Sequence, residues 1–472
     1  MSASCFPYFA VGEKYRDFAV RNVPRVAEIR DRRILDAFFA SASGDQTFFL
    51  DSSMKHDRWG RYSFCGADPF LTLRSLGRFS VISTDTGSFS LPADPFYLLD
   101  SILDFLGTRP TDLPFPFAGG AVGYLGYDLG RWVERVPCRA SADLPFPDMV
   151  FAFYRSFFAA DHQEGRLYYV RWQDPDHSLS VPEIPENKCT FETAGGRLID
   201  RSFCEEDYIR AVERAQEYIS AGDIFQVNLS QRFTYNFQSN PSALYSRLRE
   251  INPAPFSAYL DIGSGMRILS SSPERFLFLR SGEVHTCPIK GTRPRGRPHS
   301  AADRAVQEEL LRSEKDNAEL CMIVDLERND LGRVCDYGSV RVVRDRELHT
   351  FATVHHLIST VEGRLCPGTS VSRLLKAAFP GGSITGAPKV RAMEIVEELE
   401  PYRRSIYTGS IGYIGFDRTM DMNIVIRTLL TAANTAWYQV GGGIVADSVP
   451  RDEYEETLAK GKALEAALVE KK

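Results

Sequence analysis

The chain has 472 residues, of which 43% are hydrophobic and 25% charged, a composition typical of folded globular proteins and unlike that of disordered or fibrous ones. Its formal net charge of −6 offers no basic surface, so we expect neither a nucleic acid nor an anionic membrane as a partner. Nine cysteines without a CxxC pair, no apolar stretch of about 18 residues and no visible signal peptide predict a cytoplasmic protein with free thiols.

The first region, residues 1–172, is rich in aromatic residues, glycine and proline. Short strand-like runs occur at 46–50 and 149–154, and the apolar spacing at 97–107 predicts a helix. The polar, proline-containing segment 173–202 is the predicted linker to the second region.

The second region, residues 203–472, alternates helical and strand patterns. Helices are predicted at 205–222, in one long element at about 301–326, and from Pro450 to the end. Strands are predicted at 225–233, 256–261, 267–269 and 275–279. Strands interleaved with helices indicate an α+β fold in which sheets pack under helices.

Two of the predicted helices carry stripes of charged side chains. Asp316 and Glu319 are three positions apart, and Glu453, Glu456 and Lys460 share one face of the last helix. Such carboxylates suit Mg²⁺, which takes a few carboxylates together with water and substrate oxygens. Paired acids are also common on exposed helices, so the pattern alone leaves both interpretations open.

Other residues have two interpretations as well. The run 441–443 is three glycines, whose backbone N–H groups suit a carboxylate or phosphate, and a tight turn is the alternative. Arg427 lies inside an apolar run and needs a partner if it is buried, so an anionic ligand is a candidate. His356 is either a core imidazole or a ligand contact, and Lys290 by itself is an ordinary turn lysine.

Five segments at 271–275, 288–296, 316–332, 380–389 and 441–456 carry a further resemblance. They contain Ser-Ser-Pro-Glu-Arg, Pro-Ile-Lys-Gly-Thr, Asp-Leu-Glu-Arg-Asn-Asp, Pro-Gly-Gly-Ser-Ile-Thr-Gly and Gly-Gly-Gly-Ile-Val-Ala-Asp-Ser. In this order they resemble the chorismate-utilising enzymes, which include anthranilate, aminodeoxychorismate, isochorismate and salicylate synthases. The resemblance is dense over 203–470 and thinner over 45–70 and 115–155. It implies two antiparallel β-sheets packed face to face with helices outside.

The resemblance also implies a site, position by position. Glu319 and Glu456 match two Mg²⁺-binding glutamates, with Asp316 and Glu453 in the adjacent acidic positions. Glu274 matches the general acid that protonates the departing 4-hydroxyl group of chorismate. The remaining matches are to substrate contacts, with the glycines as a backbone turn that holds a carboxylate: Gly291, Thr292, His356, Thr385, Tyr407, Arg427, Gly441, Gly442, Gly443 and Lys460.

Two positions distinguish the reactions of the family. Gln226 stands where the isochorismate and salicylate synthases have a lysine that activates water, and a glutamine cannot act as that base. Residue 290 is typically alanine in anthranilate synthases, whereas Lys290 is similar to the aminodeoxychorismate branch. The resemblance therefore implies amination of chorismate at C4 for 4-aminobenzoate and folate synthesis. Lys290 is then a covalent nucleophile or, in the alternative, only a substrate contact.

Two other functions stay open: an anthranilate synthase component I, which releases pyruvate, and an inactive subunit that binds chorismate or tryptophan. The chain shows no glutaminase pattern of its own. The family uses ammonia from a separate subunit, so we expect a glutaminase partner in a transient heterodimer.

The family also has a tryptophan pocket built from an N-terminal segment and a Pro-X-X segment. The matching residues here are Ser52, Gly60, Arg61, Tyr62, Ser63, Pro255, Phe256 and Ser257. Asp51 stands where anthranilate synthases commonly have glutamate. Regulation by tryptophan, a buried structural tryptophan and no ligand are the three possibilities.

Overall fold

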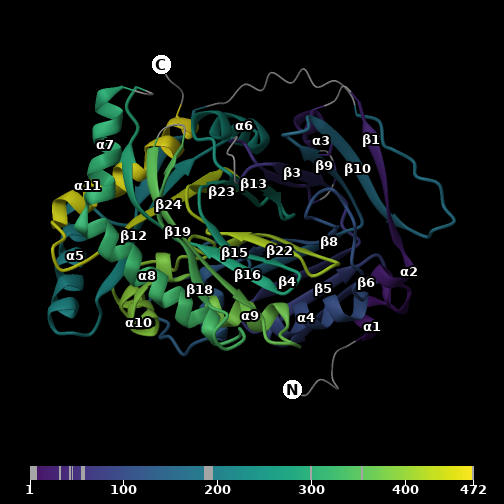
Figure 1. Ribbon diagram of the computed structural model, residues 1–472, viewed down its shortest axis with the longest axis horizontal. Helices are drawn as coiled ribbons and strands as arrows, with labels where there is room; N and C mark the ends of the chain where they lie inside the picture. The colour runs from purple at the N-terminus through teal and green to yellow at the C-terminus, as the bar shows by residue number, and fades with distance from the viewer. Residues whose placement is uncertain are drawn as a thin grey trace.

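The computed structural model describes residues 8–30, 33–41, 44, 46–54, 59–184, 195–297, 300–351 and 354–469. Two large antiparallel sheets form its centre (Figure 1). The first sheet has the spatial order β1 (Val23–Ile29), β10 (Arg166–Gln173), β9 (Ser156–Asp161), β3 (Tyr62–Gly66), β2 (Phe48–Asp51), β13 (Phe256–Asp261), β14 (Arg267–Ser272), β23 (Thr428–Ala432), β24 (Thr435–Ile444), β12 (Gln226–Asn236) and β11 (Arg197–Arg201), with β20 (Gly386–Ala387) beside β12.

The second sheet begins with the strands that carry the central motifs. Its order is β17 (Ile289–Pro294), β19 (Val354–Arg364), β16 (Glu283–Cys287), β15 (Arg275–Arg280), β22 (Met420–Asn423), β21 (Ser410–Gly415), β7 (Gly120–Leu125), β8 (Met149–Tyr154), β4 (Leu71–Leu76), β5 (Phe79–Thr84) and β6 (Gly87–Pro92), with β18 (Arg341–Thr350) beside β19. Apolar side chains of both sheets pack against one another between them, among them Phe48, Phe64, Tyr124 and Tyr413. The expected face-to-face packing of two antiparallel sheets is confirmed.

Helices lie on the outer sides of this sandwich, with α3 and α6 on one side of the view and α4 and α9 on the other (Figure 1). Their apolar faces complete two further cores against the sheets. The helices are α1 (Tyr8–Val11), α2 (Phe18–Arg21), α3 (Ile34–Ser41), α4 (Pro95–Leu106), α5 (Glu205–Ser220), α6 (Pro241–Ile251), α7 (Ala301–Arg312), α8 (Glu314–Gly332), α9 (Val371–Ala378), α10 (Lys389–Leu399) and α11 (Pro450–Leu468), and the short 3₁₀ turns are η2 (Glu13–Tyr15), η3 (Tyr127–Trp132) and η4 (Gly382–Ile384). No helix within the described ranges is both long enough and apolar enough to cross a membrane.

Each sheet contains strands from both sequence regions, and the two groups of strands meet at one pair of neighbouring strands in each sheet. β2 pairs with β3 on one side and with β13 on the other, and β7 pairs with both β8 and β21. Part of the segment predicted as a linker is itself strand β11, which pairs with β12 at the edge of the first sheet. The boundaries 1–172, 173–202 and 203–472 therefore describe regions of sequence that share their sheets.

The long helix predicted at 301–326 is wrong as a single element. The chain turns at Ser313, whose backbone is extended (φ −63°, ψ 107°), so that α7 ends at Arg312 and α8 begins at Glu314. The Ser313 hydroxyl accepts a hydrogen bond from the backbone N–H of Asp316 at 3.3 Å. A serine that caps a new helix in this way competes with helix continuation, which the apolar spacing does not reveal.

Candidate active site

A cavity of about 540 Å³ is lined by strands of both sheets, mainly β12, β17, β19 and β24, and by helices α8 and α11. Fourteen of the sixteen predicted catalytic, metal and substrate positions line it: Glu274, Lys290, Gly291, Thr292, Asp316, Glu319, His356, Tyr407, Arg427, Gly441, Gly443, Glu453, Glu456 and Lys460. Thr385 and Gly442 do not line it. Thr385 is buried, with its hydroxyl donating to the Gly381 carbonyl at 2.9 Å.

Lys290 reaches this cavity beside a bulge in β17. The pairing of β17 with β19 shifts register between Lys290 and Thr292, and Gly291 between them has a φ of +67°. A Cβ atom on Gly291 would lie 2.8 Å from Cδ1 of Leu310, so glycine is needed for both conformation and space. The Lys290 amine makes no hydrogen bond or ion pair within the described part of the chain, which leaves it available to a ligand.

Glu274 stands directly before β15 and is buried. The Ser383 hydroxyl donates a hydrogen bond to its Oε1 atom at 2.6 Å. Burial raises the pKa of Glu274 to about 7, against the opposing effects of the Ser383 hydrogen bond and the positive charge of Lys290. A carboxyl group that keeps a share of its proton at neutral pH suits a general acid.

His356 is buried at the same end of the cavity. Its Nδ1 atom lies 2.9 Å from the Thr292 hydroxyl and 3.4 Å from the Gly291 carbonyl. Burial, together with the charge of Arg427, lowers the pKa of His356 to about 4. The imidazole is therefore neutral at physiological pH and shapes the bulge that carries Lys290.

Arg427 and Tyr407 give part of the cavity wall the character of an anion site. Arg427 has a φ of +53° and its guanidinium makes no hydrogen bond or ion pair with any described residue. Burial lowers its pKa and raises that of Tyr407, which lines the same wall, to about 12. A buried cation and a protonated phenol are suitable donors to a ligand carboxylate.

The carboxylates of α8 and α11 meet at the cavity as the helix spacing predicts. On α11, Lys460 lies 2.5 Å from Glu456, and Glu453 accepts a hydrogen bond from Ser448 at 2.7 Å. On α8, Asp316 is paired with Arg293 at 2.9 Å, whereas Glu319 has no ion pair or hydrogen bond among the described residues.

The carboxylates at these helices could supply part of the coordination shell of a Mg²⁺ ion, with water and substrate as the other ligands. No group of three or more His, Cys, Asp or Glu side chains that could hold a metal ion occurs within the described ranges. Carboxylates from two helices nevertheless face one cavity, and Mg²⁺ is commonly held by one or two carboxylates with water and substrate oxygens.

The triple glycine is not the turn that was expected. Gly441, Gly442 and Gly443 lie inside β24, paired with Ser230, Leu229 and Asn228 of β12. Close approach explains the glycines, because a Cβ on Gly443 would lie 2.1 Å from Nε2 of Gln226, and one on Gly441 would lie 2.5 Å from the Leu229 carbonyl. The backbone faces the cavity at two of the three positions and is closed off at Gly442, which lies against Glu453.

Among the cavity residues that were not singled out from the sequence, three polar ones hold other parts of the site or its wall. Ser383 holds Glu274, the Asn228 amide donates to the Ser383 carbonyl at 2.8 Å, and Arg404 lies in the cavity wall. Ser383 lies inside a quoted motif and Asn228 lies two residues after Gln226, so both segments gave a signal. Arg404 had none, because it stands next to Arg403 in a polar stretch.

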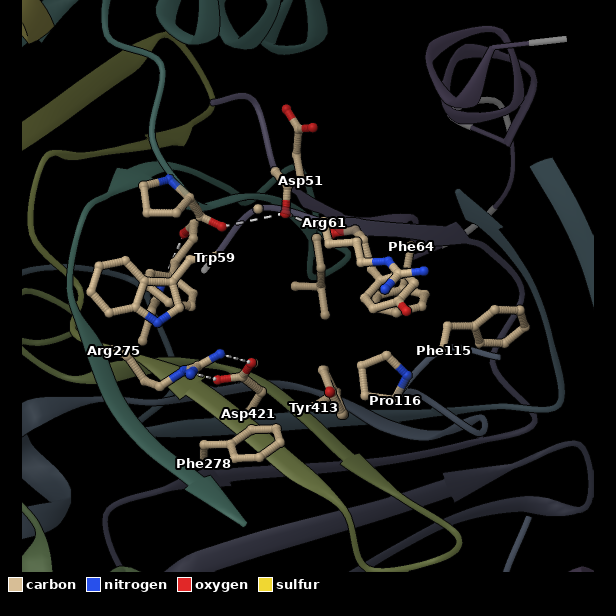
Figure 2. Close-up of a pocket in the computed structure, with 18 of the residues that line it drawn as sticks. Asp51, Trp59, Arg61, Phe64, Phe115, Pro116, Arg275, Phe278, Tyr413 and Asp421 are labelled. Atoms are coloured by element: carbon tan, nitrogen blue, oxygen red, sulfur yellow. Dashed lines mark hydrogen bonds and ion pairs between the residues drawn. The ribbon is translucent and has the colours of Figure 1, made fainter. Parts of the chain in front are cut away.

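A second cavity of about 370 Å³ lies beside β2, β13 and β15 (Figure 2). Seven of the eight predicted tryptophan-pocket residues line it, and Ser63 does not. Its walls are aromatic, with Phe64, Phe115, Phe278 and Tyr413, and the ion pair between Arg275 and Asp421, 2.8 Å long, lies along one side (Figure 2). This combination suits a flat apolar ligand with a polar group.

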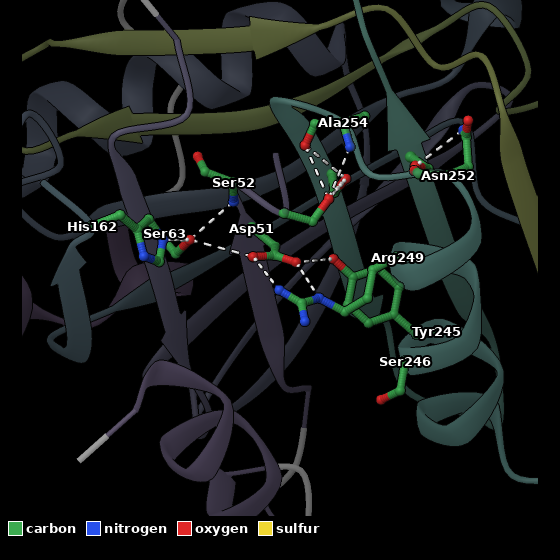
Figure 3. Close-up of polar contacts among 12 residues, drawn as sticks. Asp51, Ser52, Ser63, His162, Tyr245, Ser246, Arg249, Asn252 and Ala254 are labelled. Atoms are coloured by element: carbon green, nitrogen blue, oxygen red, sulfur yellow. Dashed lines mark hydrogen bonds and ion pairs between the residues drawn. The ribbon is translucent and has the colours of Figure 1, made fainter. Parts of the chain in front are cut away.

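Asp51 directs its carboxylate away from this cavity (Figure 2) and into a buried network (Figure 3). Arg249 of α6 donates to it at 2.7 Å, and the Tyr245 hydroxyl donates at 3.2 Å. Ser63 turns to the same side, with its hydroxyl 2.7 Å from Nε2 of His162 and accepting from the Ser52 backbone at 2.9 Å. The Asp51 carboxylate and Ser63 therefore fix the strands behind the cavity, which Asp51 lines and Ser63 does not.

Comparison with known proteins decides the family. The model for chorismate binding enzymes matches residues 72–466. The chain belongs to the chorismate-binding enzymes. It is 40% identical over 441 residues to aminodeoxychorismate synthase component 1 of Bacillus subtilis (strain 168), covering 89% of this chain and 93% of that protein. It is 41% identical over 443 residues to anthranilate synthase component 1 of Thermus thermophilus, covering 91% and 93%.

A solved structure agrees with this assignment. The crystal structure of anthranilate synthase component I from Streptococcus pneumoniae TIGR4 matches with a TM-score of 0.76 and 31% identity, covering 86% of this chorismate-binding enzyme and 92% of that chain. The family and the fold implied by the sequence resemblance are thus confirmed. Relatives with both synthase names occur at similar identity, so a choice between the two reactions must come from residues of the cavity.

Proposed function

We propose that this chorismate-binding enzyme aminates chorismate at C4 to give 4-amino-4-deoxychorismate, a step towards 4-aminobenzoate and folate. The observation that carries the proposal is the presence of Lys290, without a protein partner in the described chain, in the same cavity as the protonatable Glu274. With alanine at position 290 the cavity would hold the acid but no nucleophilic side chain at that position. Anthranilate formation needs no such side chain, because ammonia itself adds at C2.

The two residues divide one difficult substitution into two easier ones. The lone pair of the Lys290 amine forms a bond to C2 of the ring, the double bonds shift, and the C4–oxygen bond breaks as Glu274 gives its proton to the departing hydroxyl, which leaves as water. Ammonia then forms a bond to C4, the double bonds shift back, and the C2–nitrogen bond to Lys290 breaks. The proton released by the incoming ammonia returns to the Glu274 carboxylate, so the enzyme is restored.

The rest of the cavity would orient the substrate. Arg427 and Tyr407 are suited to the enolpyruvyl carboxylate, and the β24 backbone with Lys460 is suited to the ring carboxylate. Glu319 and Glu456 would hold Mg²⁺, whose charge, when it is bound, would withdraw electron density through the ring carboxylate. Glu456→Gln is expected to weaken the Mg²⁺ dependence of the rate, and an unchanged Mg²⁺ titration would remove Glu456 from the metal site.

Ammonia is proposed to come from a separate glutaminase subunit, bound transiently. The name "component 1" of the relatives supports a partner component. Gln226 supports amination over hydration of the ring, because a glutamine amide cannot act as the base that activates water. A cytoplasmic location is likewise a proposal, supported by the free cysteines found among the described residues.

A product assay tests the proposal. The purified protein would be incubated with chorismate, Mg²⁺ and ammonium while pyruvate release and product mass are followed together. We expect an amino product that keeps the enolpyruvyl group. Anthranilate with one equivalent of pyruvate would instead assign the anthranilate synthase reaction, and no product even with a glutaminase partner would favour an inactive binding subunit.

We also propose that the second cavity binds tryptophan. Its aromatic walls would take the indole ring, and the ion pair between Arg275 and Asp421 would give the amino acid a charged neighbour. Calorimetric titration with L-tryptophan is expected to show binding at one site per chain, with L-alanine as the matched control. The absence of a binding signal for L-tryptophan would contradict this proposal.

A further inference from the structure

Arg404 lines the active-site cavity and is only 2% exposed. All five of its N–H donors have acceptors within the protein. Nε and Nη2 donate to the two carboxylate oxygens of Glu400 at 3.0 and 2.8 Å. The others donate to the carbonyls of Asn228 and Ile384, at 2.6 and 2.9 Å, and to the Thr408 hydroxyl at 3.4 Å.

Glu400 is equally buried and is held from the other side. Its Oε1 atom accepts hydrogen bonds from the backbone N–H and the hydroxyl of Ser230, at 2.9 and 2.7 Å. Both charges are therefore compensated and hydrogen-bonded, which a buried ion pair requires to be tolerated. These hydrogen bonds fix the positions of the Arg404 and Glu400 side chains relative to each other and to β12.

The guanidinium joins three segments that each carry a cavity group. Asn228 belongs to β12, Ile384 follows Ser383, which donates to Glu274, and Thr408 follows Tyr407. The Tyr407 ring centre lies 5.9 Å from Arg404, and the Tyr407 backbone N–H donates to the Arg404 carbonyl at 3.0 Å. Within the described chain, Arg404 is the side chain whose hydrogen bonds reach all three of these segments.

The segment that Arg404 holds has an unfavourable backbone. Ser405 and Thr408 have φ values of +52° and +61°, in the left-handed region that non-glycine residues rarely adopt. Such conformations persist only where the surroundings fix them. Since every N–H of Arg404 is already used, the guanidinium has none left for a substrate carboxylate and acts through its neighbours.

We propose that Arg404, held by Glu400, is a positioning residue that sets the acid end of the cavity, Ser383 with Glu274, against the anion end formed by Tyr407. This inference rests on the proposed function, since Glu274 and Tyr407 are its acid and its substrate contact. Arg404 is not a catalytic residue.

The test compares two equivalent substitutions in the full-length protein. Arg404→Lys keeps the charge but cannot reproduce the five-donor fork. Arg131→Lys is the matched control, because Arg131 also pairs with a buried carboxylate, Glu397, but does not line the cavity. For each variant we would measure the melting temperature, kcat, KM for chorismate and the pH at which kcat/KM falls by half.

Both variants are expected to melt cooperatively at a lower temperature than the wild type. In Arg404→Lys we expect kcat to fall by about tenfold or more, KM to rise, and the alkaline midpoint of kcat/KM to move, because Ser383 no longer holds Glu274 in place. Arg131→Lys is expected to keep kcat, KM and the midpoint. Values for a folded Arg404→Lys within about twofold of the wild type would overturn the proposal.

The two hypotheses fail separately. Wild-type protein that forms anthranilate contradicts the proposed reaction, while the ratio between variant and wild type for that product still judges the role of Arg404. If the wild type forms no product, the rise in melting temperature on adding chorismate takes the place of kinetics. Arg404→Lys should then lose that rise and Arg131→Lys should keep it, and an equal rise in both would overturn the proposal.

Discussion

Two opposing influences set the pKa of Glu274. Burial raises it, and the neighbouring positive charge of Lys290 lowers it without cancelling the effect of burial. Burial alone would keep the carboxyl protonated, whereas Ser383 and Lys290 stabilise the carboxylate. The resulting pKa of about 7 places the proton transfer within reach at physiological pH.

The pKa of Glu274 predicts how activity and stability depend on pH. Activity should fall as pH rises through about 7, because the acid form is lost. For stability, the folded-state pKa is raised from 4.5 to about 7, so the folded state binds more protons and stability falls as pH rises between those values. The effect is of order 3 kcal/mol.

Glu274→Gln cannot titrate and should escape this loss. Urea unfolding at about pH 5 and about pH 8 is therefore expected to show the variant gaining stability relative to the wild type at the higher pH, while its amination rate is low at both. An unchanged stability difference between the two pH values would contradict a raised pKa for Glu274.

Sequence motifs predicted the placement of individual residues well where the chemistry lies in the motif itself. Lys290, Glu274, Arg427 and the α11 stripe all line one cavity. Arg404 could not be found in this way, because its partners Asn228, Ile384 and Glu400 come from separate segments that only the fold brings together. Thr385 was predicted as a substrate contact but does not line the cavity. Its hydroxyl instead donates a hydrogen bond to the Gly381 carbonyl, four residues earlier in the chain.

At the level of elements, the bulge in β17 decides where Lys290 lies. Gly291 has a positive φ, and a Cβ atom added to it would meet Leu310 of α7 and Asp316 of α8. Helices α7 and α8 both pack against the strand that carries Lys290. The bulge also separates Lys290 from Thr292, whose hydroxyl binds His356.

Gly291→Ala tests this arrangement against Gly282→Ala. Both glycines have positive φ values, +67° and +80°, but a Cβ on Gly282 would meet nothing within 4 Å. Each variant should lose about 1 kcal/mol from backbone strain, measured by urea unfolding. Only Gly291→Ala should in addition lose activity by about tenfold or more, through displacement of Lys290. Equal activity in the two variants would contradict the role of the bulge.

Helix and strand positions followed the sequence pattern closely where that pattern is local. The strands at β8 and β13 were predicted to the residue, and α4, α5 and α11 within a few residues. The break between α7 and α8 and the placement of the three glycines inside β24 were not predicted. The helix break follows from the local cap by Ser313, which apolar spacing does not reveal, and the position of the glycines depends on the close approach of β12.

The whole molecule is built from strands of both sequence regions. β2 lies between β3 and β13, and β7 lies between β8 and β21, so each sheet loses central hydrogen bonds without the other region. The sequence could not reveal this, because pairing between distant strands leaves no local pattern.

This sharing of both sheets between the regions predicts that neither region folds alone. Fragments 1–172 and 203–472, produced separately, should each lack cooperative thermal unfolding and chorismate turnover, while the intact chain melts in a single transition. Circular dichroism and size-exclusion chromatography would check both fragments. A 203–472 fragment that melts cooperatively and turns over chorismate would contradict the prediction.

The central claim is that Lys290 forms a bond to the substrate ring. The most direct measurement is the intact mass of the protein after rapid quenching, with chorismate and Mg²⁺ present and ammonium absent. The account predicts a mass increase equal to chorismate less one water, located at Lys290 and missing in Lys290→Ala. Wild-type protein that makes the amino product when ammonium is supplied, yet shows no such adduct at any quench time, would contradict it.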